Sequence, residues 1–178
     1  MNNGTHFLVT VSSEDQQGLI AAISRALFEL DINLGDASYN VLGRGGRFVA
    51  LCLAPASMDG GRIRDALRAT PVLDAAQVEV VPFDLPVRHR DEGIAVRVVF
   101  SGRDMPGLVA QITELAQDFS ANIEQMQTRV VQGEAGDAYR IEMVLTVPEA
   151  RREALLSALQ NVASGLGLDF RTGTEPAV

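Results

Sequence analysis

The sequence predicts an α+β chain made of two tandem βαββαβ units, each with a four-stranded antiparallel sheet and two helices on one face. Two observations predict this fold. An internal repeat matches residue i with residue i+89, giving nine identities without a gap from Val9 to Val41 of the first copy. In both copies, stretches with apolar residues at every second position and stretches with a 3.6-residue spacing follow one another in the same order. The 178 residues therefore divide into two domains of about eighty residues each.

The identities fall in a predicted strand, the loop after it, the following helix and the next strand. The matched pairs are Val9 and Val98, Ser12 and Ser101, Asp15 and Asp104, Gly18 and Gly107, Leu19 and Leu108, Ala21 and Ala110, Ile23 and Ile112, Asn33 and Asn122, and Val41 and Val130. A glycine shared at a tight turn is expected from folding alone. An aspartate and an asparagine that return at the same offset are harder to explain in that way.

The first copy contains six predicted elements. Alternating residues predict a strand over 6–12, and apolar residues at helical spacing predict a helix from 19 to 31. Strands are expected over 32–42 and 48–54, joined by a glycine-rich hairpin turn at 43–47. A second helix over 59–70 and a short strand ending before Pro82 complete the unit. This order is that of the ferredoxin-like split βαβ unit.

The second copy repeats this order. Strands are expected over 94–100, 122–131, 138–147 and 168–171, and helices over 108–119 and 149–163. The predicted boundaries are an N-terminal domain at 1–82, a linker at 83–93, a C-terminal domain at 94–171 and a disordered tail at 172–178. Matching Pro55 with Pro148 raises the offset from 89 to 93, which places four extra residues in the second hairpin, around 133–137.

The composition indicates the cellular compartment of the protein. No apolar run approaches the length that crosses a membrane, and the first residues lack the basic and apolar parts of a secretion signal. The one cysteine, Cys52, has no partner for an internal disulfide. We therefore expect a cytoplasmic protein that does not interact with membranes.

Charge limits the function classes. Each predicted domain has a net charge of −3, within a total of −8 for the chain, so direct nucleic-acid binding is disfavoured. All 15 basic residues are arginine. The absence of lysine excludes Schiff-base chemistry, a lysine nucleophile and a phosphate loop that depends on lysine.

The loop between the first strand and first helix of each copy is the candidate binding site. Such a corner directs unpaired backbone N–H groups of the first helical turn outward, where they can bind a carboxylate. The ammonium of a free amino acid needs acceptors, which Asp15 or Asp104 could supply together with the amide of Asn33 or Asn122. A side chain in place of the corner glycine would hold a ligand away from the backbone. The alternative is a tight turn in which the aspartate only caps the helix.

Other functional sites are not predicted. His6 and His89 belong to different parts of the chain and have no second metal-type ligand at useful spacing. Cys52 alternates with apolar strand residues and has no histidine placed beside it, as a nucleophile would need. The glycines at 43–46 join two strands and do not open a helix, so a dinucleotide motif is disfavoured. We therefore expect no catalytic residue, metal or cofactor.

Two motifs resemble those of the ACT domain, a small-molecule sensor of amino-acid metabolism. They are Asp-x-Pro-Gly-Leu-Val at 104–109, which opens a helix, and Asn-Ile at 122–123, which starts the next strand. The resemblance covers almost the whole chain. It implies that paired units set their sheets edge to edge and bind amino acids at the seam between the loop of one unit and the asparagine-bearing strand of the other. One implied pocket contains Asp15, Gln17, Gly18 and Leu19 with Asn122 and Ile123, and its mate contains Asp104, Met105, Pro106, Gly107 and Leu108 with Asn33 and Leu34.

The first loop departs from the family pattern. Gln16 and Gln17 stand where the second loop has Met105 and Pro106, and Glu14 stands where the second loop has arginine. The extra acid would repel a ligand carboxylate.

The resemblance also implies how the protein works. It suggests a non-catalytic protein, able to form a homodimer, that binds no DNA itself and contacts a transcriptional activator. The alternatives are a regulatory subunit of an enzyme and an RNA-binding sheet. The few aromatic residues and the negative charge disfavour the RNA-binding sheet.

Overall fold

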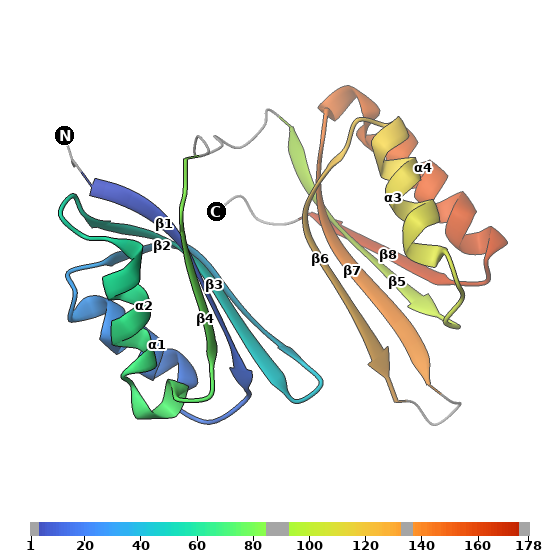
Figure 1. Ribbon diagram of the computed structural model, residues 1–178. Helices are drawn as coiled ribbons and strands as arrows, with labels where there is room; N and C mark the ends of the chain where they lie inside the picture. Colours follow the sequence, from blue (N-terminus) through green and yellow to red (C-terminus); the bar gives the residue numbers. More distant parts are fainter. Residues whose placement is uncertain (1–3, 85–92, 133–136, 175–178) are drawn as a thin grey trace. The chain divides into compact units, whose positions relative to one another are not determined.

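The computed structural model describes residues 4–84, 93–132 and 137–174. The described residues form two compact units, the first up to residue 84 and the second from residue 93 onwards. Each unit has one antiparallel four-stranded sheet with its helices on one face (Figure 1), as the sequence predicts. The predicted extra residues of the second hairpin and most of the predicted linker lie outside the described residues.

The first unit has strand order β2-β3-β1-β4. Its elements are β1 (Gly4–Glu14), α1 (Leu19–Phe28), β2 (Asn33–Leu42), β3 (Gly45–Pro55), α2 (Gly60–Arg68), the short 3-10 helix η1 (Pro71–Leu73) and β4 (Gln77–Pro82). The sequence pattern did not predict η1, because three residues are too few for a period and only Pro71 marks its start.

The second unit has strand order β6-β7-β5-β8. Its elements are β5 (Ile94–Gly102), α3 (Leu108–Asp118), β6 (Asn122–Val131), β7 (Ala138–Val147), α4 (Glu149–Gly165) and β8 (Asp169–Thr174). The prediction that the tail is disordered from 172 was wrong for its first three residues. Thr172, Gly173 and Thr174 pair with β5, whose own length leaves backbone groups free to extend the ladder.

Each unit has its own core between the sheet and the helices. In β1, the alternating residues Phe7, Val9 and Val11 are buried, and Ile23 and Leu27 of α1 pack against them. In β5, Val96, Val98 and Phe100 are buried in the same way, and the Phe100 ring lies 5.0 Å from that of Phe170, centroid to centroid. Alternation in the strands and helical spacing in the helices thus produce the two cores.

Cys52 belongs to the core of the first unit. Its side chain is buried on β3, and burial raises the pKa of its thiol to about 11, from an ordinary value of 9.0. We expect the native protein at pH 8 to resist thiol reagents, whereas unfolded protein reacts quickly. Because the folded-state pKa is raised, the stability that the neutral thiol contributes is complete below pH 9 and is lost as pH rises towards 11. Labelling with a chromogenic disulfide at pH 8, with and without denaturant, compares the reactivity of the thiol in the folded and unfolded protein. A native thiol that reacts at the unfolded rate would contradict the burial of Cys52.

Candidate functional site

The two predicted loops form equivalent corners at the N-termini of α1 and α3. The helix-capping residues are Gly18, with φ 87°, and Gly107, with φ 81°, both in the left-handed conformation that favours glycine. A Cβ added at Gly18 would meet no atom within 4 Å, and one at Gly107 would meet only Gln111 Nε2 at 4.0 Å. Backbone conformation, and not crowding, therefore requires glycine, and open space lies beside each corner.

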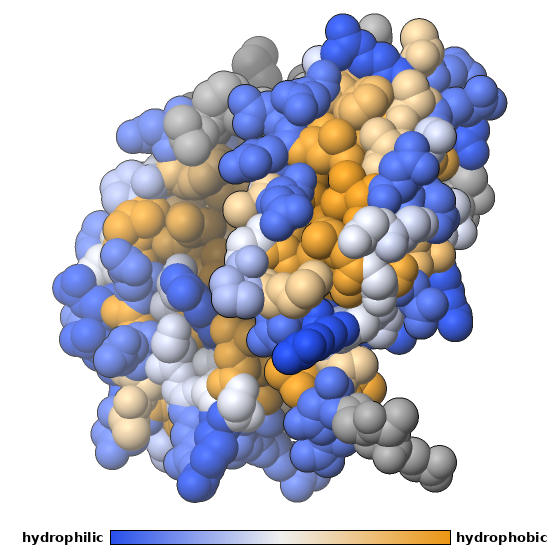
Figure 2. All heavy atoms as spheres, turned by 90° about the vertical axis from the view of Figure 1, so that its right-hand side faces the viewer, coloured by the Kyte–Doolittle hydropathy of each residue, from blue (hydrophilic) through white to orange (hydrophobic). Residues whose placement is uncertain are grey.

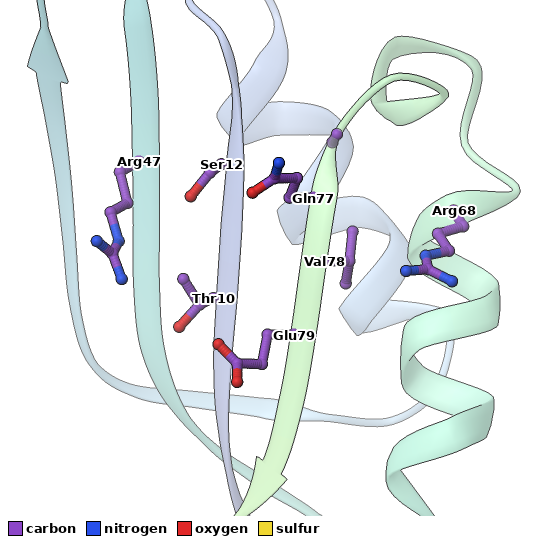
Figure 3. A pocket seen from close by; sticks show the side chains of 8 residues that line it. Thr10, Ser12, Arg47, Arg68, Gln77, Val78 and Glu79 are labelled. Atoms are coloured by element: carbon purple, nitrogen blue, oxygen red, sulfur yellow. The ribbon is translucent and has the colours of Figure 1, made fainter.

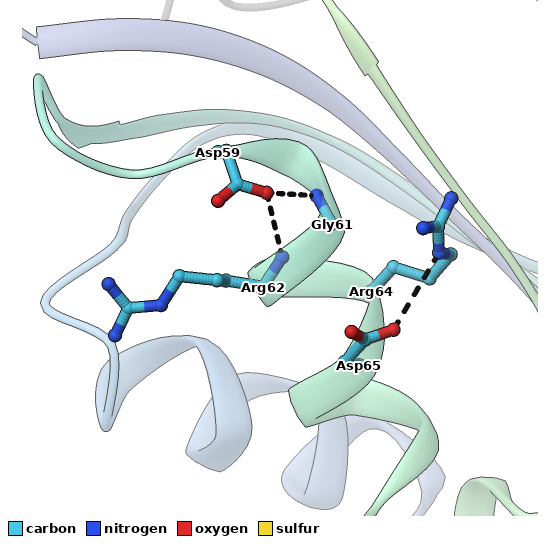
Figure 4. Close-up of polar contacts among 5 residues, drawn as sticks. All are labelled: Asp59, Gly61, Arg62, Arg64 and Asp65. Atoms are coloured by element: carbon cyan, nitrogen blue, oxygen red, sulfur yellow. Dashed lines mark hydrogen bonds and ion pairs between the residues drawn. The ribbon is translucent and has the colours of Figure 1, made fainter.

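Neither aspartate caps its helix. The described residues provide no side-chain cap for α1 or α3, and neither helix has an acidic residue in its first turn. The other two helices differ. Asp59 caps α2 through its Oδ1 atom, which accepts hydrogen bonds from the amides of Gly61 at 2.7 Å and Arg62 at 3.1 Å (Figure 4), and α4 begins with Glu149. The corner helices thus keep the positive N-terminal end that attracts an anion.

In the first unit, side chains and backbone of the same unit contact the corner and occupy its aspartate. The Tyr39 hydroxyl, from β2, donates a hydrogen bond to Asp15 Oδ1, and the Asp15 amide donates to the Arg44 carbonyl at 2.8 Å. Arg44 also pairs with Glu14 at 2.5 Å. Gly46 makes room for the tyrosine, because a Cβ there would collide with the Tyr39 hydroxyl. The Asp15 carboxylate therefore already has a partner within the first unit.

The second corner lacks these closing contacts. At the matching positions, Thr128 replaces Tyr39 and Arg103 replaces Glu14. Tyr139 stands where the first unit has the glycine that accommodates Tyr39. Among the residues that the structure describes, Asp104 has no hydrogen-bond or ion-pair partner and is exposed. Its carboxylate is thus available beside the uncapped end of α3.

The two leucines of the predicted site are core residues. Leu19 and Leu108 are both 2% exposed, so their side chains offer no surface to a ligand. Their backbone amides donate to the carbonyls of Gln16 and Met105, each at 3.3 Å. Gln17 and Pro106 are exposed, and Met105 is half-buried. A ligand at either corner would therefore meet backbone and polar groups, with Met105 or Gln17 at its side.

The asparagines lie away from the corners of their own units. Asn33 and Asn122 open β2 and β6, at the opposite end of α1 and α3 from the glycines. A helix of about ten residues separates them by roughly 15 Å. The structure of each unit alone therefore brings Asp15 to Tyr39 but does not bring either glycine to its own asparagine. Binding between an asparagine and the loop of another unit stays a prediction.

Both asparagines occupy the same local geometry. Each follows a turn with a left-handed residue, Asp31 or Ser120, and each precedes a β-bulge. The side-chain amide of Asn122 donates to Glu124 Oε1 at 2.8 Å. Asn122 and Ile123 also line an open hollow of about 590 Å³ beside the C-terminal half of α3, together with Thr113, Glu114, Gln117, Ser120 and Ala121. Leu34, the counterpart of Ile123, is exposed at 41%.

A second hollow, of about 350 Å³, lies around β4 in the first unit. Figure 3 shows Thr10, Ser12 and Arg47 on the neighbouring strands, with Arg68 of α2 on the other side of β4. It contains none of the residues predicted from the sequence.

Exposed apolar side chains are concentrated on one surface of the second unit and on two edge strands. Figure 2 shows apolar residues gathered over the second unit inside a hydrophilic rim. In that unit, Val109, Leu115 and Leu156 are only partly buried against the core. The edge strands β2 and β6 also expose large apolar side chains. These are Leu34, Val41 and Leu42 on β2, and Met126, Val130 and Val131 on β6. Exposed edges of this kind favour pairing with another strand.

The contact between Tyr39 and Asp15 was not predicted from the sequence, and it can be tested by titration. The hydrogen bond to Asp15 raises the pKa of Tyr39 above its usual 10.0. Because the folded-state pKa is raised, the contact is complete below pH 10 and is lost as pH rises through the higher value. The chain has two tyrosines and no tryptophan, so a Tyr139→Phe variant reports Tyr39 alone by tyrosinate absorbance. Adding Asp15→Asn should lower the titration midpoint, and an unchanged midpoint would rule out the contact.

A comparison with known protein families found a match in the second unit. Residues 95–173 match the family model of the ACT domain. The second unit is therefore similar to the ACT domain, and the whole chain has the fold of two tandem ACT-like units.

Among the solved structures that match, two cover 98% of this chain with TM-scores of 0.77 and 0.72. One is described as an unknown protein from Galdieria sulphuraria, with 22% identity, a TM-score of 0.77, and coverage of 98% of this chain and 100% of that chain. The other is described as a proposed glycine cleavage system transcriptional repressor, with 14% identity, a TM-score of 0.72, and coverage of 98% and 99%. At these identities the likeness shows the fold. No curated protein matches the sequence.

No helix among the described residues is long and apolar enough to cross a membrane. The same residues contain no group of three or more histidine, cysteine, aspartate or glutamate side chains that could hold a metal ion.

Proposed function

We propose that this chain is a non-catalytic regulatory protein that binds a small amino acid, glycine being the best candidate, and controls a transcriptional activator of glycine cleavage by protein contact. The proposal rests mainly on the structure of the second corner. There, Gly107 opens α3 without a side-chain cap and Asp104 lies exposed beside it. The ACT family match supports an amino-acid ligand. The full-length likeness to the proposed glycine cleavage repressor supports the choice of pathway.

The chemistry of the second corner fits a zwitterion. The ligand carboxylate would accept hydrogen bonds from the first-turn amides of α3, and the exposed Arg103 guanidinium adds a positive charge nearby. The ligand ammonium would donate to the Asp104 carboxylate. The first corner is the weaker candidate, because Tyr39 already donates to Asp15, and Glu14, which pairs with Arg44, stands where the second corner has Arg103. The asparagine-bearing strand of another ACT unit, in this chain or in a second copy, would complete the pocket.

The small size of glycine limits the affinity with which any protein can bind it. Glycine has five heavy atoms, so a ceiling of about −1.5 kcal/mol per atom gives roughly −7.5 kcal/mol, or a low-micromolar Kd at best. We therefore expect amino-acid binding in the concentration range over which metabolite levels vary. Once bound, a ligand that stabilises one arrangement of the protein could change its affinity for a partner by a coupling energy of ~1–3 kcal/mol.

Calorimetry with glycine, serine and the branched-chain amino acids tests the proposal. A saturable heat and a rise in melting temperature with at least one of them would support amino-acid sensing. No heat, together with no melting shift at millimolar ligand, would exclude it. Pull-down from a native lysate with and without the ligand would then identify the partner. A transcriptional activator supports the proposed pathway, whereas an enzyme would favour a regulatory subunit.

A further inference from the structure

The helix-free faces of the two sheets differ in chemistry although the fold is duplicated. In the first unit, this face is largely apolar at its centre, because Leu8, Val49 and Leu51 alternate with the core residues of β1 and β3. Leu53 and Val81 extend the apolar area. In the second unit, the corresponding face is charged.

The strand register brings the charged residues of the second unit together. Residues that lie directly opposite on neighbouring strands share a face. Arg129 lies opposite Arg140, and Arg97 lies opposite Val144 on the same face. Arg171 lies opposite Val99, which itself lies opposite Glu142. We call this surface the arginine face and define it by Arg97, Arg129, Arg140, Arg171, Glu142 and Asp169. Its four arginines and two acids give it a net charge of +2, in a chain of −8.

Three of these residues are specific to the second copy. Arg97 matches Leu8 and Arg129 matches Asn40 at the offset of 89, and Glu142 matches Val49 at the offset of 93. Arg140, by contrast, has an arginine counterpart, Arg47. The same sheet is built in the first unit without this charge, so the arginine face is not a requirement of the fold.

Among the described residues of the arginine face, guanidinium groups outnumber carboxylates by four to two. Arg140 Nε lies 2.7 Å from Glu142 Oε1, and Arg97 Nη1 lies 3.8 Å from Glu142 Oε2, so one carboxylate serves two guanidinium groups. Arg129 donates to the neutral side chain of Gln127 at 3.0 Å. Like charges directly opposite on adjacent strands are destabilising, as with Arg129 and Arg140. Features that cost stability without serving the fold point to function.

We propose that the arginine face docks an acidic segment of a partner protein, rich in aspartate and glutamate. Guanidinium groups bind carboxylates in a planar, two-pronged geometry. The side chains of Arg97 and Arg140 are about half exposed, at 49% and 46%, so an acidic segment can reach them. The inference rests on the proposed function for the existence of a protein partner, but the binding of an acidic segment is measured without any amino acid.

A nucleic acid fits this face less well. Ferredoxin-like sheets that bind RNA stack bases on aromatic side chains of the open face. In the second unit, Phe100, Tyr139 and Phe170 instead pack against the core on the helix side. Glu142 and Asp169 would also repel phosphates.

Fluorescence anisotropy with the full chain and a labelled Glu/Asp peptide tests the proposal, with the matching Gln/Asn peptide as the neutral probe. The double variant Arg97→Gln, Arg171→Gln should weaken binding of the acidic peptide about tenfold. Glu142→Gln, which removes the central carboxylate, should tighten it about threefold. Melting curves show whether each variant is folded, and a gain of binding by Glu142→Gln does not arise from misfolding.

The matched control removes two positive charges from another surface. Arg62→Gln with Arg64→Gln changes α2 of the first unit (Figure 4) and should leave peptide binding within about twofold of wild type. Equal losses in the two double variants, no tightening by Glu142→Gln, or preferential binding of a single-stranded oligonucleotide would each overturn the proposal. Peptide binding without any amino-acid heat would instead retain the arginine face and reject amino-acid sensing.

Discussion

Replacing Gly107 with valine is expected to abolish amino-acid binding while the second unit stays folded. Gly107 has φ 81°, a conformation that a β-branched residue adopts only at a cost of about 1–3 kcal/mol. The space beside it is open, so the corner can shift without a core clash. That shift would move the first-turn amides of α3 relative to Asp104. Calorimetry measures the loss, and circular dichroism measures whether the unit remains folded.

Gly18→Val is the matched control for this variant. It introduces the same side chain at φ 87° in the corner that Tyr39 closes. We expect its stability cost to be similar and its binding to be close to wild type. Loss of binding in Gly18→Val with retention in Gly107→Val would show that the first corner is the functional one, contrary to our assignment.

Replacing Phe100 with alanine is expected to lower the free energy of unfolding of the second unit by about 3–5 kcal/mol. The side chain is 1% exposed, packs in the core of the second unit and contacts the Phe170 ring. A domain of this size has a total stability of only about 5–10 kcal/mol, so most of it would be lost. Denaturant unfolding followed by circular dichroism gives the change.

Two controls accompany the Phe100→Ala measurement. Val99→Ala changes the next residue, which is half-buried on the helix-free face, and should cost about 1 kcal/mol or less. The Cys52 thiol reports the core of the first unit, which is a separate cluster of residues. It should stay protected from thiol reagents after the second unit unfolds. Exposure of Cys52 in the same step would contradict the separation of the two cores.

Most of the fold could be predicted from the sequence because its signals are local or repeated. Alternation marks Val9 and Val98 as core strand residues, and helical spacing does the same for Ile23 and Ile112. The end of β8 was missed because Thr172, Gly173 and Thr174 have no apolar alternation. Their structure comes from pairing with β5, which is a property of the sheet and not of the segment.

The candidate site was predictable only in part. The repeat identified Asp15, Asp104 and both corner glycines, because it compares positions directly. It could not show that Tyr39 reaches Asp15, because that contact depends on how β2 and the corner meet in space. The partner of Arg44, and the hydrogen bond from the Gln16 side chain to the Val72 carbonyl at 3.0 Å, depend on the same tertiary arrangement. The difference between the two corners therefore became visible only in the structure.

The most direct test of amino-acid binding at the second corner is a titration of the ¹⁵N-labelled protein with glycine, followed residue by residue in amide NMR spectra. Saturable shifts of the Gly107 and Leu108 signals, with the Gly18 and Leu19 signals unchanged, are the predicted result. Signals of both corners that stay unchanged at millimolar glycine and at millimolar serine, or shifts confined to Gly18 and Leu19, would contradict it.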